Sequence, residues 1–184
     1  MKKITDEQLV SCYLKNREDA VLEELIKRYL PLIFGFIKRY TGNEETAADI
    51  TQETFVKVWK NIKNFDSSKS FKTWIFTIAK RIAIDELRKK KPIPFSIFDK
   101  NGKSNFGESL ADESPSLFDQ ILSRQTSREL SLAILKLPPD YRPVINMRVK
   151  DGLKFIEIAN VLKEPLNTVK SRYRRGLDLL KKFL

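Results

Sequence analysis

Two stretches of the sequence combine side chains that can bind nucleic acid. Residues 167–175 read NTVKSRYRR, in which amide and hydroxyl groups lie among lysine and arginine residues. Amides and hydroxyls can hydrogen-bond to base edges, while the cations can contact phosphates. Residues 70–81 read SFKTWIFTIAKR, which mixes aromatic rings with cations. An exposed ring between cations can stack on an unpaired base. The two stretches therefore indicate two kinds of nucleic-acid surface.

The first stretch lies at the start of a predicted helix that follows a tight turn. A short helix over 153–163 carries an apolar stripe of Ile156, Ala159 and Leu162. Residues 164–167 (EPLN) interrupt it, and a second helix begins at Thr168. Two short helices joined by a tight turn predict a helix-turn-helix, whose second helix enters the major groove of DNA.

The second helix separates its apolar and polar side chains. At helical spacing, the apolar side comprises Val169, Tyr173, Leu177 and Leu180. The residues that we predict to contact duplex DNA are Asn167, Thr168, Lys170, Ser171, Arg172, Arg174 and Arg175. A solvated basic helix end is the alternative interpretation. The helix dipole disfavours cations at the start of a helix, so an anionic partner explains them better.

A predicted helix over 70–90 positions the aromatic and basic stretch. Its expected buried stripe comprises Phe71, Trp74, Ile75, Ile78 and Ile82. Lys72, Phe76 and Lys80 then lie on the opposite, exposed face, where they can hold an unpaired strand. Asp85 is expected on the buried side. Arg88 opens a basic run (RKKK, 88–91) that suits either phosphate contact or the helix dipole.

A third segment, AADITQETFVKVWKNI over 47–62, predicts a helix with a protein-binding face. Its expected core stripe comprises Ala48, Phe55, Trp59 and Ile62. Asp49 and Glu53 lie four residues apart on the outer face with Ile50 beside them. An exposed isoleucine between carboxylates indicates a docking surface. Ordinary helix charges next to a lone surface isoleucine are the alternative.

The rest of the chain predicts an all-α protein with two domains. The helical patterns cover a capped start at Thr5 and residues 17–40, 44–63, 70–90, 125–136, 140–150, 153–163 and 167–183. Residues 94–124 are rich in Pro, Gly, Ser and Asp and predict a linker between domains at 1–93 and 125–184. The domains carry net charges of +6 and +7 and the linker −2. Two basic domains indicate a polyanionic partner.

Composition excludes several functional classes. The chain has 184 residues, no histidine and one cysteine, Cys12, so we expect no zinc site, no cofactor and no Cys/His nucleophile pair. The first residues do not resemble a signal peptide, and no window approaches eighteen apolar residues. We therefore expect a cytoplasmic protein that does not insert into membranes.

Taken together, the motifs resemble bacterial RNA polymerase sigma factors of the extracytoplasmic-function (ECF) class. The segment AADITQETFVKVW resembles their region 2.2, and FDSSKSFKTWIFTIAKRIAIDELRKKK resembles regions 2.3 and 2.4. The run LPPDYRPVINMRVKDGLKFIEIANVLKEPLNTVKSRYRRGLDLLKK resembles region 4. The resemblance implies a protein without catalytic residues that binds core polymerase and directs promoter-specific initiation. It also implies a linker that threads toward the polymerase active centre, and an anti-sigma protein as a possible partner.

The resemblance assigns roles by position. The polymerase-binding residues would be Asp49, Ile50, Gln52, Glu53 and Phe55. The residues that open and read the −10 strand would be Asn64, Ser67, Ser68, Lys69, Ser70, Lys72, Trp74, Phe76, Lys80, Arg81 and Arg88. The residues predicted above to contact duplex DNA would read the −35 element.

The chain departs from the family pattern at two places, and two other functions stay open. Lys80-Arg81 replaces a common Arg-Asn pair, which bears on the −10 base that is captured, and Asn167 replaces a common glycine before the recognition helix. A stand-alone helix-turn-helix regulator would bind duplex DNA without polymerase. A metal-dependent nuclease or recombinase would use the carboxylate pairs Asp49/Glu53 or Asp85/Glu86, but the sequence places no third ligand.

Overall fold

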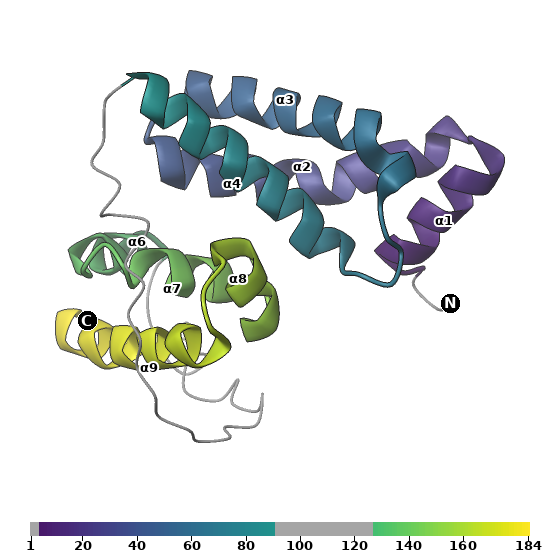
Figure 1. Ribbon diagram of the computed structural model, residues 1–184. Helices are drawn as coiled ribbons and strands as arrows, with labels where there is room; N and C mark the ends of the chain where they lie inside the picture. The colour runs from purple at the N-terminus through teal and green to yellow at the C-terminus, as the bar shows by residue number, and fades with distance from the viewer. Residues whose placement is uncertain (1–3, 91–126) are drawn as a thin grey trace. The chain divides into compact units, whose positions relative to one another are not determined.

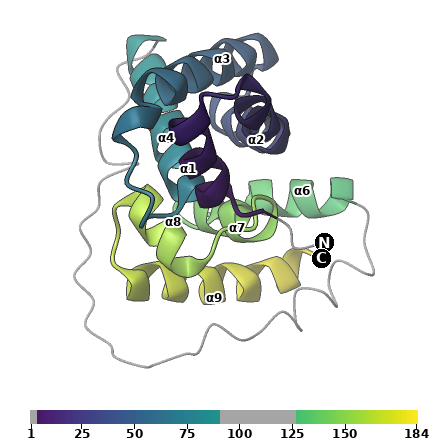
Figure 2. The same ribbon diagram turned by 90° about the vertical axis from the view of Figure 1, so that its right-hand side faces the viewer.

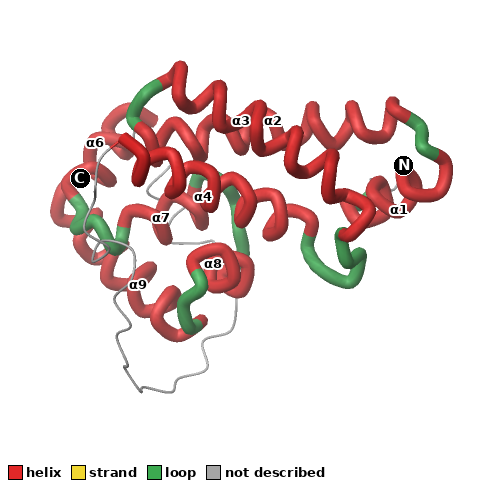
Figure 3. The backbone as a smooth tube through the Cα atoms, turned by 45° about the horizontal axis from the view of Figure 1, so that its top comes forward, coloured by secondary structure: helices red, strands yellow, loops and turns green. Residues whose placement is uncertain are grey.

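The computed structural model describes residues 4–90 and 127–184, which form helices and short connections (Figure 3). No strand occurs in these two ranges. The all-α prediction is therefore confirmed. The predicted linker over 94–124 lies outside the described residues, and the proposed domain boundaries stay a prediction. None of the helices in the two ranges is long and apolar enough to span a membrane.

The helices belong to two compact units, the first of which contains four helices. These are α1 (Asp6–Asn16), α2 (Asp19–Thr41), α3 (Glu44–Asn61) and α4 (Phe71–Lys90), with a short 3-10 helix η1 (Ile62–Asn64) after α3 (Figure 1). Thr5 and Gln8 form a capping box that starts α1. Gly42 ends α2 with φ +67, a left-handed conformation that suits glycine, and the Asn43 side chain caps α3.

The core of the first unit lies between α2, α3 and α4. These helices run alongside one another, and α1 packs at one end of the bundle (Figure 2). Phe36 of α2 packs edge-on against Phe76 of α4, with ring centroids 5.0 Å apart. At the α1 end, Tyr29, Phe65 and Phe71 pack their rings at 5.3–5.6 Å. Aromatic contacts therefore join α2 to α4 within a core that also contains aliphatic side chains of all three helices.

The second unit contains α6 (Ser127–Lys136), α7 (Arg142–Val149), α8 (Phe155–Leu162) and α9 (Leu166–Phe183). Its core includes Leu130, Ile134, Leu137, Ile145 and Leu180. Gly176 lets α9 approach α7 closely, because a Cβ at this position would lie 3.1 Å from the Ile145 side chain. The C-terminal helix is thereby fixed against the rest of its unit.

Candidate functional site

Helix α3 buries a different face from the one that its sequence predicts. Its buried residues are Ala47, Ile50, Thr51, Thr54 and Val58, whereas the expected core residues Ala48 and Trp59 are exposed. The reason lies in the two threonines. Their hydroxyls donate to the carbonyl oxygens of Ala47 (2.6 Å) and Ile50 (2.7 Å), so they enter the core with their hydrogen-bonding groups satisfied.

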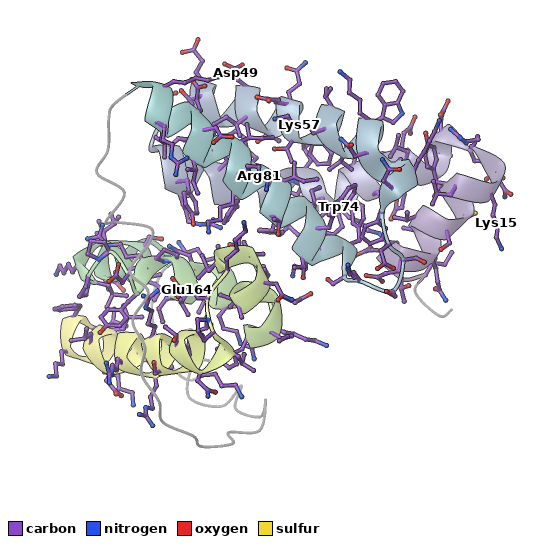
Figure 4. The ribbon with its side chains drawn as sticks, in the orientation of Figure 1. Lys15, Asp49, Lys57, Trp74, Arg81 and Glu164 are labelled. Atoms are coloured by element: carbon purple, nitrogen blue, oxygen red, sulfur yellow. The ribbon has the colours of Figure 1, made fainter. Side chains whose placement is uncertain are left out.

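The prediction that Ile50 is exposed is therefore wrong. Ile50 is only 3% exposed and belongs to the core of the first unit. Asp49, Gln52 and Glu53 are exposed as predicted, and Asp49 projects away from the helices in Figure 4. Glu53 forms an ion pair with Lys57 one turn later, at 2.9 Å. These polar residues lie next to an apolar surface that the sequence analysis did not identify.

This surface is an apolar groove between α2 and α3, which we call the α2/α3 groove. Its volume is about 760 Å³. It is lined by Leu22, Ile26, Leu30, Pro31 and Phe34 of α2 and by Ala48, Thr51, Gln52, Phe55, Val56, Val58 and Trp59 of α3. Trp59 is 56% exposed, Leu30 47% and Val56 41%. A contiguous apolar hollow with a polar edge is typical of a surface that binds another protein.

The groove explains why α3 carries two apolar stripes. One stripe packs in the core, and the other, which includes Phe55 and Trp59, faces the groove. The sequence signal that could have identified it is an apolar arc too wide for one buried face. Phe55, which we predicted to bind polymerase, lines the groove and is half-buried.

On α4, the predicted exposed ring is buried. Phe76 is fully buried against Phe36, so it cannot stack on an unpaired base in this structure. The physical reason is that α4 packs against α1, α2 and α3, which buries more than one stripe. Asp85 was expected on the buried side but is exposed. Trp74 is half-buried, with its ring 5.0 Å from that of Phe65.

The other predicted −10 residues lie at the start of α4, in the loop before it, or along the helix. Asn64, Ser67, Ser68, Lys69, Arg81 and Arg88 are exposed, and Ser70, Lys72 and Lys80 are half-buried. Trp74 lies near the start of α4, and Arg81 lies further along the helix (Figure 4). The structure thus leaves Lys69, Arg81 and Arg88 exposed while it buries the phenyl ring of Phe76.

The loop over 65–70, which we call the α4 loop, has an ordered turn. The Asp66 carboxylate accepts hydrogen bonds from the Ser68 backbone N–H (3.0 Å) and the Ser68 hydroxyl (2.7 Å). These hydrogen bonds, with Lys69 nearby, hold the pKa of Asp66 below its ordinary value. The Ser70 hydroxyl accepts from the Thr73 N–H at 3.2 Å, so it caps α4.

In the second unit, α8 and α9 form the predicted helix-turn-helix. The turn is at Lys163 to Pro165, with Lys163 in the left-handed conformation at φ 59. Helix α9 begins at Leu166, two residues earlier than predicted, because Pro165 takes the cap position and Asn167 already lies in the helix. The expected stripe of α8 is wrong at Ile156, which is 52% exposed, while Ile158 is buried.

The polar side of α9 carries the predicted duplex-binding residues. Val169 and Leu180 are buried, as predicted. Asn167, Arg174 and Arg175 are exposed, and Thr168, Lys170 and Ser171 are half-buried. The Tyr173 ring packs edge-on against Phe155 of α8, 5.0 Å away, and thereby joins the two helices. The helix therefore presents several cations and small polar groups on one exposed side.

Arg172 differs from the other cations of α9. Its guanidinium donates to both oxygens of the Glu164 carboxylate, at 2.7 and 2.6 Å. The two side chains are only 17% and 21% exposed. Arg172 of α9 is thus held against the turn by a charge-assisted contact. This contact is a structural role that the sequence analysis did not predict.

The comparisons with known proteins agree with this arrangement. Residues 25–93 match the family model for sigma-70 region 2, and residues 127–180 match the model for sigma-70 region 4. The chain is 34% identical over 175 residues to the ECF RNA polymerase sigma factor SigW of Bacillus subtilis (strain 168), covering 93% of this chain and 92% of SigW. It is 32% identical to the ECF sigma factor RpoE of Cereibacter sphaeroides, covering 92% and 89% of the two chains.

Solved structures support the same fold. CnrH, in its complex with the cytosolic domain of CnrY, superposes with a TM-score of 0.65 at 20% identity and covers 96% of this chain and 95% of CnrH. RpoE of Bartonella quintana, in its complex with the anti-sigma factor NepR, gives a TM-score of 0.63 at 23% identity, with coverages of 88% and 95%. The chain therefore belongs to the sigma-70 family, in its ECF class of RNA polymerase sigma factors.

Proposed function

We propose that this ECF sigma factor binds core RNA polymerase through the α2/α3 groove and its polar edge. The observation that carries the proposal is the groove itself, an apolar hollow in which Trp59, Leu30 and Val56 are about half exposed. Asp49, Gln52 and Glu53 lie on the same helix and provide polar contacts. An apolar centre with a charged edge fits the amphipathic surface of a partner helix. Ile50 supports this surface from the core.

The α4 loop and the outer side of α4 then contact the −10 element. Ser67, Ser68 and Lys69 are exposed on the loop, and Arg81 and Arg88 are exposed on the helix. Phosphate contacts by these cations would hold a strand along α4. Because Phe76 is buried, the aromatic contact falls to Trp74, whose half-exposed ring lies beside the loop at Phe65. The neighbouring pair Lys80-Arg81 is then a specificity candidate.

Helix α9 contacts the −35 duplex. Asn167, Thr168 and Ser171 supply hydrogen-bonding groups for base edges, and Lys170, Arg174 and Arg175 supply cations for phosphates. Arg172 acts through the turn, because its guanidinium is already bound to Glu164. Binding by both units should weaken steeply with salt, since phosphate contacts release counterions.

The remaining expectations complete the proposal. The chain supplies no catalytic residue, because polymerisation belongs to the core enzyme, and it acts in the cytoplasm with promoter DNA. An anti-sigma protein would cover the surface at Asp49 and Glu53 and the surface of the helix-turn-helix. RpoE of Bartonella quintana, whose fold is similar, forms a complex with the anti-sigma factor NepR, which supports an inhibitor of this chain. A stand-alone helix-turn-helix regulator is not favoured, because both units match sigma regions.

Size-exclusion chromatography with sigma-free core polymerase tests the proposal. The wild-type chain should co-elute with core, and the double variant Asp49→Arg/Glu53→Arg should elute alone. The control Asp140→Arg/Asp178→Arg changes the net charge equally at exposed carboxylates outside the groove, so it should still co-elute. If the wild type elutes alone, or if both variants lose binding equally, the groove is not the polymerase-binding surface.

A further inference from the structure

A hydrogen bond connects α1 to the start of α4. The Glu7 carboxylate accepts from the Phe71 backbone N–H at 3.1 Å, although the two residues are 64 positions apart. The first N–H groups of a helix have no partner within the helix, and a carboxylate also favours the positive end of the helix dipole. Helix α4 therefore has two caps, since Ser70 provides the other from its own loop.

The position of Glu7 is fixed by contacts between α1 and α2. Arg28 donates to the Asp6 carboxylate at 2.8 Å and to the Ile4 carbonyl oxygen at 3.1 Å. The Tyr29 hydroxyl donates to the other oxygen of Asp6. The first turn of α1 is thus bound to α2 on the side next to α4, and Figure 1 shows the start of α4 beside this end of α1.

The two ends of the α4 loop are anchored in different ways. Phe65, at the first end, is buried and packs its ring against Phe71 and Trp74 at 5.6 and 5.0 Å. The other end reaches α4 at the Phe71 amide, which Glu7 holds. An open hollow of about 510 Å³, lined by residues of α1 and by Ser67, lies between α1 and the tip of the loop. The tip is therefore supported mainly through its anchored ends.

We infer that Glu7 is a positioning residue for promoter opening: by capping α4 it fixes the α4 loop in the conformation that receives the −10 strand. This inference rests on the proposed function of the loop. Glu7 lies on α1 and does not line the α2/α3 groove, so its loss should leave polymerase binding intact. Helix α1 then serves promoter opening without contacting core polymerase through that groove.

The test compares Glu7→Ala and Glu7→Gln with the matched control Glu18→Gln. Glu18 is the exposed residue that precedes α2; its carboxylate accepts from the Asn16 side-chain amide at 3.0 Å but caps no helix N–H, and a glutamine can still accept from Asn16. Each full-length chain is assembled with core polymerase. The probe is a fork DNA with a single-stranded −10 region, selected from a random library by the wild-type holoenzyme. The readouts are core affinity, fork-DNA affinity and permanganate reactivity of unpaired thymines on the matching duplex promoter.

Glu7→Ala should lower fork-DNA affinity and promoter opening about tenfold, as expected for loss of a hydrogen bond to a charged group, with core affinity within about twofold of wild type. Glu7→Gln should recover most of the activity, because its amide oxygen can still accept from Phe71. Amide hydrogen exchange at Phe71 should rise in Glu7→Ala and change little in Glu7→Gln. Glu18→Gln should match the wild type in every readout.

Four results would overturn the inference. Opening by Glu7→Ala at the wild-type level shows that the cap does not matter for the loop. Equal losses of core affinity and fork-DNA affinity in Glu7→Ala would assign Glu7 to general stability. The same conclusion would follow if Glu7→Ala fails to fold while Glu7→Gln matches the wild type in both Phe71 exchange and activity. A wild-type holoenzyme that selects no DNA contradicts the proposed function itself, and the inference falls with it.

Discussion

Replacing Trp59 should weaken polymerase binding strongly while it leaves the fold intact. Trp59 is 56% exposed in the α2/α3 groove, which corresponds to about 140 Å² of surface for a side chain of this size. At about 25 cal/mol per Å², its complete burial by a partner contributes about 3.5 kcal/mol. Because association also orders both partners, we expect Trp59→Ala to cost about 2–3 kcal/mol, or about 30- to 160-fold in Kd.

The assay is fluorescence anisotropy of a labelled chain titrated with sigma-free core polymerase. Ile4→Ala is the matched control, since Ile4 is 54% exposed in the same unit and does not line the groove. It should bind within about twofold of wild type. Far-UV circular dichroism should show that both variants keep their helix content, because neither side chain belongs to the core. A Kd for Trp59→Ala within about threefold of wild type would refute the assignment of the groove.

Three further predictions follow from contacts in the two units. Phe76→Ala should destabilise the first unit by about 3–5 kcal/mol, measured as a lower Tm, because it leaves a cavity in the core beside Phe36. An unchanged Tm with a specific loss of single-strand binding would contradict the burial of this ring. Glu164→Ala, Arg172→Ala and the double variant should show a coupling of about 1–2 kcal/mol in hydrogen exchange of α9 amides, whereas additive effects would exclude a structural pair. Since the pKa of Asp66 is lowered in the folded chain, the stability that its ionised carboxylate adds to the α4 loop should be present above the ordinary aspartate pKa. That stability should be lost as the pH falls through the lowered pKa. NMR titration should show the lowered midpoint, and Asp66→Asn should abolish the pH dependence.

Helix positions followed well from the sequence because capping and breaking residues act locally. Thr5 and Gln8 start α1, Gly42 ends α2, and Asn43 starts α3, each at or next to the position expected. The break before α9 was also expected, although Pro165 starts the helix two residues earlier. Such signals depend on a few neighbouring residues, so no knowledge of the tertiary structure is needed.

The buried faces were harder to predict because they depend on which neighbours a helix meets. Helix α3 has two apolar stripes, and the one buried in the core contains Thr51 and Thr54. The hydroxyls of these threonines donate to backbone carbonyls of their own helix. On α4, contact with three helices buries Phe76 together with Ile75. Periodicity identifies a helix, but it does not say how many of its sides are covered.

Contacts between distant residues could not be predicted at all. Nothing in the sequence near Glu7 indicates that it caps a helix 64 positions later. The pairing of Glu164 with Arg172 is nearer in sequence, but it depends on the left-handed turn at Lys163 that aligns α8 with α9. In both cases the three-dimensional path of the backbone decides which of several possible partners a charged side chain meets.

The α2/α3 groove is already open in the chain alone, and this has a consequence for control of the protein. In the proposed function, a partner enters a hollow that is already formed, and the fraction of chains that it occupies follows mass action. Two proteins that insert apolar side chains between Leu30 and Trp59 cannot do so together. The fraction of chains bound to each protein is then set by the concentrations and affinities of the two. Control at this groove is therefore a competition that changes gradually with the concentration of either protein.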